Sequence, residues 1–235
     1  MLVRADLHIH SCLSPCGSLD NSPKAIAEKA KEKGLELVAL TDHNTALNCP
    51  AFKINCQQLG LWSVYGLEVT SNEEAHLVCL FETVEAALEF SDFVYKYIPD
   101  IPNKPEVFGD QVYVDENEDI LGEVDKHLPN ATGLSIDDVR EEVFFRNGLF
   151  IPAHVDKPVF SIISQLGFLP DADYTAIEVF NPANAKNYSD KYPVISDSDA
   201  HYLDDIAKKQ LYIDVDEKSF SALRDSLQNR RIILK

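Results

Sequence analysis

The amino-acid sequence predicts an α/β fold in which short buried strands alternate with amphipathic helices. Apolar runs of strand length recur along the 235 residues. Between most of these runs lie stretches with a helical spacing of apolar residues, and these stretches carry residues that start and stop helices. The hydrophobic fraction of 45% is that of an ordinary globular protein. We therefore expect βα units and a largely parallel sheet.

Six stretches are expected to be helical. The first has Ser22 as its N-cap, Pro23 at the first helical position and Gly34 just past its end. Ser135 caps another helix, which has two aspartates in its first turn. The expected helices occupy residues 23–33, 50–59, 84–97, 136–146, 158–165 and 217–229.

The apolar runs between these helices are expected to be strands. They occupy residues 2–7, 37–41, 62–67, 77–81, 149–153, 176–180, 193–196 and 231–234. Residues 99–133 break the alternation, because they contain three early prolines, two strand-like runs at 111–114 and 120–124, and an acidic turn between the runs. This pattern predicts a hairpin-like insertion. The sequence does not decide whether this insertion is a lid, a dimer contact or a segment without a specific role.

Composition limits the possible partners and the compartment. The formal net charge is −18, and a surface this acidic is not expected to bind long nucleic acid, since phosphate binding depends on Lys and Arg. A local site with metal ions could still take a phosphate. No apolar run reaches the length of a membrane span or of a signal peptide. The five cysteines have no compact spacing, which favours reduced thiols in a cytoplasmic protein outside the membrane.

Possible metal ligands gather at the ends of the expected strands. His8 and His10 lie two residues apart, and on an extended strand such a pair points to one side and can reach one ion. Imidazole and carboxylate suit zinc, manganese and iron, and active sites of α/β folds gather at strand ends. The candidate ligands are His8, His10, His43, Glu68, His76, His154, Asp199 and His201.

The order of these residues resembles that of the PHP (polymerase and histidinol phosphatase) superfamily. The resemblance is carried by H-x-H at 8–10, T-D-H at 41–43 and D-A-H at 199–201, with Glu68, His76 and His154 between them. It implies one domain over residues 1–235 that forms a distorted seven-stranded β/α barrel, with the insertion at about 99–133. It also implies two or three divalent ions (zinc, manganese or iron) at the carboxyl ends of the strands.

The resemblance implies a role for each ligand. The implied sets are His8, His10, Glu68 and Asp199 for one ion, Glu68, His76 and His154 for a second, and His43 and His201 for a third. The bridging role of Glu68 agrees with its chemistry, because a carboxylate has two oxygens and can serve two cations. Asp42 is assigned to catalysis, as a residue that orients an imidazole rather than as a ligand.

The loop after the first two histidines departs from the family pattern. Family members carry a carboxylate or a histidine there as a ligand of the third ion, whereas residues 11–19 contain no acid. Cys16 is the best substitute, since a thiolate suits zinc or iron. An ordinary buried thiol is the alternative for Cys16.

A pair of divalent ions is suited to hydrolysing a phosphate ester. One ion lowers the pKa of its water to give a metal-bound hydroxide, and the other steadies the phosphoryl oxygens. Lys157, three residues after His154, is the first candidate to bind the phosphate of the substrate. Arg140, Arg146 and Lys186 are weaker candidates.

Three functions remain open from the sequence. The first is hydrolysis of a small phosphomonoester, such as a sugar, amino-alcohol or nucleotide phosphate. The second is a phosphodiesterase or exonuclease acting on short oligonucleotides. The third is a non-enzymatic metal-binding module, which the nearly complete ligand set disfavours. The sequence gives neither the native metal nor the oligomeric state.

Overall fold

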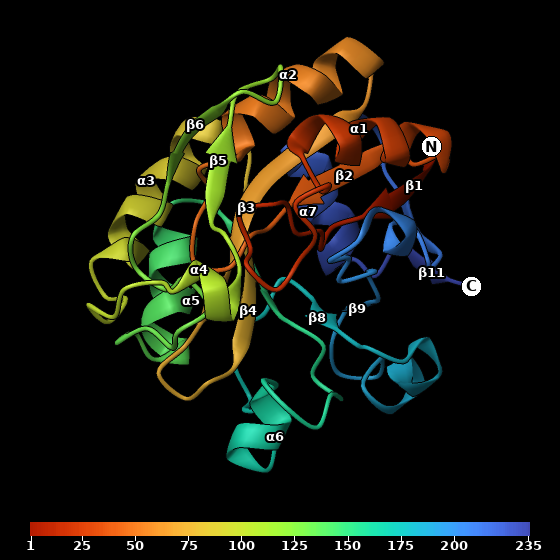
Figure 1. The fold of residues 1–235 in the computed structure, drawn as a ribbon. Coiled ribbons are helices and arrows are strands. Elements are labelled where there is room, and N and C mark those ends of the chain that lie inside the picture. Colours follow the sequence, from red (N-terminus) through yellow and green to blue (C-terminus); the bar gives the residue numbers. More distant parts are fainter.

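The structure is a computed structural model that describes residues 1–235, and one curled seven-stranded sheet forms its centre (Figure 1). The sheet forms a half-barrel, as expected for a PHP-type fold. Its strands are, in spatial order, β11 (Ile232–Leu234), β10 (Leu211–Asp214), β1 (Leu2–Asp6), β2 (Leu37–Leu40), β3 (Trp62–Thr70), β4 (His76–Phe81) and β7 (Leu149–Pro152).

The sheet is mixed, so the expectation of a largely parallel sheet is wrong. Only the pairs β1–β2 and β2–β3 are parallel, and the other four pairs are antiparallel. Residues 71–75 join β3 to β4, and a connection this short allows only antiparallel pairing. The first residue of β4, His76, therefore lies at the sheet end where β1, β2 and β3 finish.

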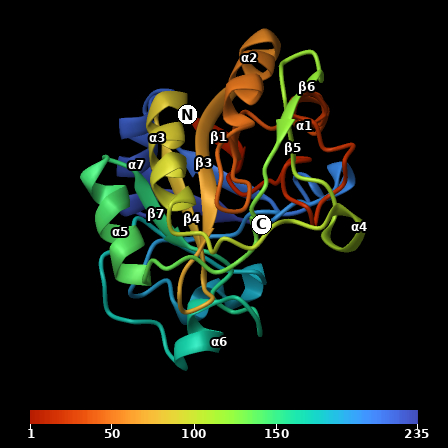
Figure 2. The same ribbon diagram turned by 60° about the vertical axis from the view of Figure 1, so that its left-hand side comes forward.

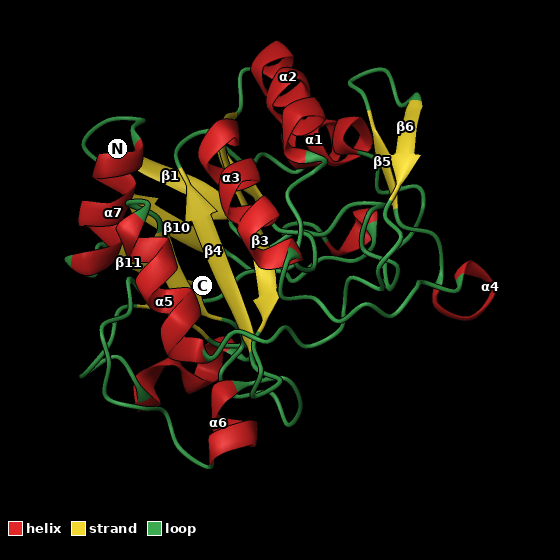
Figure 3. Cartoon of the chain, turned by 90° about the vertical axis from the view of Figure 1, so that its left-hand side faces the viewer, coloured by secondary structure: helices red, strands yellow, loops and turns green.

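Helices cover both faces of the sheet. The helices α1 (Pro23–Glu32), α2 (Cys49–Leu59), α3 (Val84–Tyr95) and α5 (Ile136–Phe145) contribute to the larger apolar core on one face. The helix α7 (Phe220–Gln228) packs into the core on the other face. Alternate residues of β2 enter the two cores, as the two-residue period of a strand requires. Figure 3 shows α3 and α5 lying along one side of the strands.

Most expected helices are present with ends shifted by one or two residues, and two are shorter than expected. The helix expected at 158–165 is α6 (Ile162–Leu166), which begins after the capping residue Ser161. The last helix begins after Ser219 rather than at Glu217. No helix of the protein is long and apolar enough to cross a membrane. The elements not expected were β10, α4 (Pro105–Phe108) and the 3-10 helices η1 (Pro182–Asn187) and η2 (Leu203–Asp205).

Two small sheets accompany the main one. The expected hairpin is confirmed as the antiparallel pair β5 (Val112–Val114) and β6 (Ile120–Glu123), and Figure 2 shows it apart from the main sheet, beside α1 and α2. The other small sheet pairs β8 (Ile177–Glu178) with β9 (Val194–Ile195) in parallel. Asn44 attaches the inserted segment to the main sheet, because its Nδ2 donates to Leu128 O at 2.7 Å and to Asn130 O at 3.0 Å.

Candidate metal centre

The carboxylate of Glu68 lies at the centre of a buried group of imidazoles. Glu68 is fully buried near the end of β3. Five imidazole nitrogens lie around it, with His8 Nε2 at 3.2 Å, His76 Nδ1 at 3.0 Å and His154 Nε2 at 3.3 Å from Oε1, and His43 Nδ1 at 3.1 Å and His10 Nε2 at 3.4 Å from Oε2. Asp199 joins the group, because its Oδ1 lies 3.4 Å from His10 Nε2 and 3.5 Å from His8 Nε2.

The strand ends bring these side chains together. His8 and His10 follow β1 and flank Ile9, which bridges to Ala200. His43 follows β2 and bridges to Glu68, and His154 follows β7. The backbone of His154 and of Asp199 has positive φ, at 31° and 54°. Residues other than glycine rarely adopt this conformation, and it occurs where function fixes a side chain. We call His8, His10, His43, Glu68, His76, His154, Asp199 and His201 the donor cluster.

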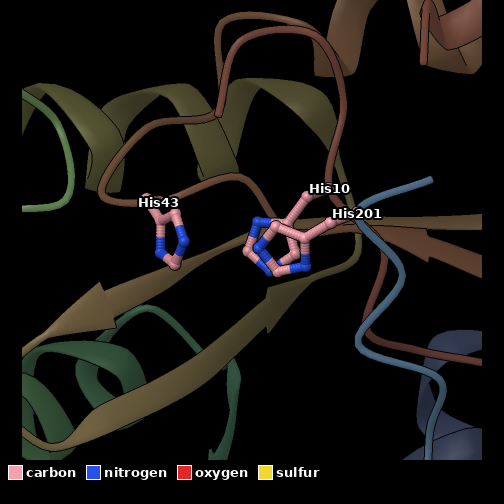
Figure 4. A group of neighbouring side chains, drawn as sticks. All are labelled: His10, His43 and His201. Atoms are coloured by element: carbon pink, nitrogen blue, oxygen red, sulfur yellow. The ribbon is translucent and has the colours of Figure 1, made fainter. Parts of the chain in front are cut away.

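Figure 4 shows three members of the donor cluster, His10, His43 and His201, with their rings gathered in one place. The ring centroids of His10 and His201 are 4.1 Å apart, and those of His10 and His43 are 4.5 Å apart. Their nitrogen atoms form one of three sets whose ligand atoms all lie within 4.8 Å of one another. The other two sets are His8, His10 and Glu68, and His43, Glu68 and His76.

The polar atoms of the cluster fit divalent cations. Both oxygens of Glu68, Nδ1 of His43 and Nδ1 of His154 are buried and have no hydrogen-bond partner. The imidazole nitrogens at 3.0–3.4 Å offset part of the cost of burying this carboxylate, and a cation with imidazole and carboxylate ligands would offset the rest. Nitrogen and oxygen donors packed this closely suit zinc, manganese or iron. The residues therefore fit a set of such ions around Glu68.

The charges of the cluster shift its pKa values in opposite directions. Burial raises the pKa of Glu68, but the charges of His76 and His8 outweigh it and hold the pKa well below its usual range. Burial lowers the pKa of His8, but Glu178, Glu68 and Asp199 raise it well above its usual range. The carboxylates are thus held ionised, which is the form that binds a cation.

Cys16 lies at the rim of the same site. It is exposed, whereas the other four cysteines are buried. Burial of the sulfur raises its pKa, but interactions with His201 and His43 lower the pKa to about 6. Hydrogen bonds with His43 and His201 thus favour the thiolate form of Cys16.

Asp42 lies beside the donor cluster, and its carboxylate makes no hydrogen bond to an imidazole. Its Oδ1 accepts hydrogen bonds from Ser11 N and Ser14 Oγ, both at 2.7 Å, and its Oδ2 accepts one from Ser11 Oγ at 2.6 Å. The Ser14 hydroxyl in turn lies 3.1 Å from His10 Nδ1. Asp42 thus positions His10 through the loop that carries Ser14.

A cavity of about 290 Å³ opens onto the cluster. Lys157 lines it, and its ammonium group pairs with Asp199 Oδ2. The other basic candidates do not line it. Arg140 belongs to α5 and Arg146 directly follows it, both pair with acids of α5, and Lys186 belongs to η1. The lining is completed by Cys16, Pro129, Val159, Phe160 and members of the donor cluster.

Glu178 was not among the predicted site residues, and it lies against the donor cluster. Glu178 is 1% exposed. Its Oε2 lies 2.9 Å from His8 Nδ1 and accepts from His154 N at 3.1 Å. A proton on His8 Nδ1 leaves Nε2 free to face Glu68, so Glu178 fixes the direction in which His8 can bind an ion. The available signal was an acid inside the apolar run at 176–180.

This geometry agrees with the comparison to known proteins. Residues 6–148 match the PHP domain family. The chain belongs to that family. The family resemblance inferred from the sequence is thereby confirmed, and so is the barrel-type fold. Members of the PHP superfamily are metal-dependent hydrolases.

Several relatives show how the PHP fold is used elsewhere. An uncharacterized protein of Methanocaldococcus jannaschii is 27% identical over 187 residues, which cover 76% of this chain and 82% of that protein. The lesion-specific endonuclease Q of Pyrococcus furiosus superposes with a TM-score of 0.71 at 22% identity, over 97% of this chain and 56% of that one. A two-domain protein of Bacteroides vulgatus that contains a predicted PHP-like metal-dependent phosphoesterase has a TM-score of 0.60 at 16% identity, over 100% of this chain and 65% of that one. The chain thus spans little more than half the length of endonuclease Q.

Proposed function

We propose that this PHP-family hydrolase cleaves small phosphomonoesters, with a sugar, amino-alcohol or nucleotide as the leaving group. The observation that supports it most is the bare, buried carboxylate of Glu68, which faces five imidazole nitrogens at the base of a cavity of about 290 Å³. A cavity of this size suits one phosphate and a small leaving group better than a folded polymer. The net charge of −18 also opposes binding of a long polyanion.

The chain supplies the residues that would hold two or three divalent ions. His8, His10, Glu68 and Asp199 would hold one, and Glu68 would share its second oxygen with another. The remaining members would be His76 and His154 for that second ion, and His43, His201 and Cys16 for a third. Bound zinc, manganese or iron would lower the pKa of a water molecule and neutralise charge on the phosphoryl oxygens.

The other residues would position the substrate and the ligands. Lys157 lies at the cavity wall, where its ammonium group would donate to a phosphoryl oxygen in place of Asp199. Glu178 would hold His8, and Asp42 would hold the loop of Ser14 beneath His10. In the reaction the water oxygen bonds to phosphorus and the bond from phosphorus to the leaving oxygen breaks. The leaving group departs as an alcohol with a proton from the water.

Endonuclease Q acts on DNA lesions and has been seen with a 27-mer duplex. The likeness to it concerns the fold, and this chain corresponds to 57% of the protein in that complex. A phosphodiesterase acting on short oligonucleotides is therefore the second candidate function.

A substrate panel tests the proposal. The protein is loaded in turn with Mn²⁺, Zn²⁺ and Fe²⁺ and supplied with phosphomonoesters, nucleoside bisphosphates and short oligonucleotides without terminal phosphate. We expect release of inorganic phosphate from monoesters. Cleavage confined to internal diester bonds would replace the proposal with the phosphodiesterase. If the fully metal-loaded protein cleaves none of these substrates, it is a non-enzymatic metal-binding module.

A further inference from the structure

Three apolar side chains line the metal cavity, and we call them the apolar wall. Val159 and Phe160 come from the loop that follows β7, and Pro129 comes from the inserted segment. Val159 is 55% exposed and Phe160 is 45% exposed. All the other residues that line the cavity have ionisable side chains. The cavity therefore combines a polar metal site with large apolar side chains that a ligand can reach.

Phe160 is held in a conformation that a bulky residue rarely adopts. Its φ is 53°, in the left-handed region that disfavours a side chain of this size. Its carbonyl oxygen accepts from His76 N at 3.0 Å, and its ring stacks on the His76 imidazole with centroids 4.9 Å apart and 13° between the planes. Backbone strain of this kind is characteristic of functional sites, and here it fixes an aromatic ring beside a predicted metal ligand.

The loop that carries Val159 and Phe160 is anchored on both sides of them. Lys157 N donates to His154 O at 2.8 Å. The Ser161 hydroxyl donates to Lys157 O at 2.7 Å and accepts from Ser164 N at 3.1 Å, which also caps α6. None of these bonds uses the side chain of Val159 or Phe160. The apolar wall is therefore preformed, and its side chains are available to contact a substrate.

We propose that Phe160, together with Val159, selects phosphomonoesters whose leaving group turns an apolar face toward this wall. With the phosphate at the metal ions beside Lys157, the leaving group is the part of the substrate that meets the wall. An apolar face buried there is removed from water together with Phe160 and Val159, which favours binding. A polyol at the same place loses hydrogen bonds to water and gains no partner. This inference rests on the proposed function and narrows its substrate class.

Phosphonates test the apolar wall without hydrolysis, because their carbon is bonded directly to phosphorus. Methylphosphonate presents the anion alone, and benzylphosphonate adds an aromatic ring next to it. Both are titrated calorimetrically into the zinc-loaded protein. We expect benzylphosphonate to bind about tenfold more tightly than methylphosphonate, since part of its ring is buried against the wall. Equal affinity of the two phosphonates would overturn the proposal.

Two substitutions connect this preference to the wall. Phe160→Asn removes the ring with a residue that tolerates the left-handed backbone, and Val159→Thr keeps the shape of the side chain but adds a hydroxyl. Each should reduce the preference for benzylphosphonate to about threefold or less, with the Kd of methylphosphonate and the zinc content of the parent. Phe168→Asn is the matched control and should keep the full preference, since Phe168 is 62% exposed and does not line the cavity.

The two variants also separate selection of the leaving group from support of His76. If Phe160→Asn holds less zinc than the parent, its ring is needed to position His76, and Val159→Thr then decides alone on the wall. A preference for benzylphosphonate that persists in Val159→Thr and in zinc-loaded Phe160→Asn would overturn the proposal.

The same preparations are tested for phosphate release from benzyl phosphate and from glycerol phosphate. In Phe160→Asn the ratio of the kcat/KM for benzyl phosphate to that for glycerol phosphate should fall about tenfold. Release of phosphate from both esters, with the same ratio in parent and variants, would overturn the wall and leave the proposed function standing. Binding of benzylphosphonate that depends on Phe160, with no phosphate released from either ester, would support the wall and overturn the proposed function.

Discussion

The donor cluster and the inserted segment at residues 99–133 differ in how their buried polar side chains are hydrogen-bonded. In the insertion, the buried side chain of Gln111 uses its whole amide. Nε2 donates to Val124 O at 2.9 Å and to Lys126 O at 2.8 Å, and Oε1 accepts from Leu128 N at 2.8 Å. In the donor cluster, both oxygens of Glu68 are buried and lack a hydrogen-bond partner.

This difference distinguishes buried polar groups that stabilise the fold from buried polar groups that are available to bind a ligand. Buried polar groups in native proteins are nearly always hydrogen-bonded, so a bare buried carboxylate calls for a ligand. Apart from Asn130 Nδ2, the buried side-chain polar atoms of the insertion are hydrogen-bonded, some of them within the insertion, and Asn44 and Asn48 bond to its backbone, which serves stability. The donor cluster leaves its bonds open for cations. Changes in the two regions should therefore be detected by different measurements.

Glu68→Ala should have the largest effect, because it removes the carboxylate shared by two ions. We expect loss of both ions and a fall in phosphate release of more than about a hundredfold. His201→Ala should disturb only one ion, and Glu82→Ala, which changes an exposed acid, should disturb none. Metal content per chain and phosphate release are measured together. A Glu68→Ala protein that keeps both ions would show that Glu68 does not bridge them.

Lys157→Ala should weaken binding of the substrate without changing the metal content. A desolvated contact between a cation and a phosphate contributes roughly 1.5–3 kcal/mol, so kcat/KM should fall about ten- to a hundredfold. A loss confined to KM would indicate uniform phosphate binding, and equal loss in kcat and kcat/KM would indicate a contact made in the transition state. Lys31→Ala, on the exposed face of α1, is the control. Kinetics equal to those of the parent would mean that Lys157 serves only to pair with Asp199.

Cys16→Ser should affect one ion and leave the pair at Glu68 in place, because a hydroxyl is a poor replacement for a thiolate. With cobalt(II) in the site, a thiolate ligand gives a sulfur-to-cobalt charge-transfer band in the near ultraviolet. We expect this band in the parent and its loss in Cys16→Ser. Cys49→Ser changes a buried thiol outside the cavity and should keep the band. A band that persists in Cys16→Ser would remove Cys16 from the ligand set.

Gln111→Ala should have the smallest effect on hydrolysis and a clear effect on stability. It leaves two carbonyls and one N–H of the insertion without their partner, so the free energy of unfolding should fall by about 1–3 kcal/mol. Gln57→Ala, at an exposed position of α2, should change it little. Denaturant unfolding and phosphate release are compared. A large fall in phosphate release with unchanged stability would show that the insertion, which already places Pro129 in the cavity wall, takes a direct part in the reaction.

The sequence predicted the donor cluster well because its signals are local. A histidine pair two residues apart, and an acid or a histidine at the end of each apolar run, can be found without knowing the fold. The strand directions could not be found in this way, since the period of apolar residues is the same in parallel and antiparallel strands. Glu178 was missed because its role depends on His8, which lies 170 residues away.

Counting the metal ions in the purified protein tests the central claim most directly. The account assigns the open polar atoms around Glu68 to cations. Elemental analysis of the protein after reconstitution with Zn²⁺, Mn²⁺ or Fe²⁺ should therefore give at least two ions per chain, and Glu68→Ala should not hold the pair. Fewer than one ion per chain after reconstitution would contradict the account, because the donor cluster would then be a buried polar network without a metal.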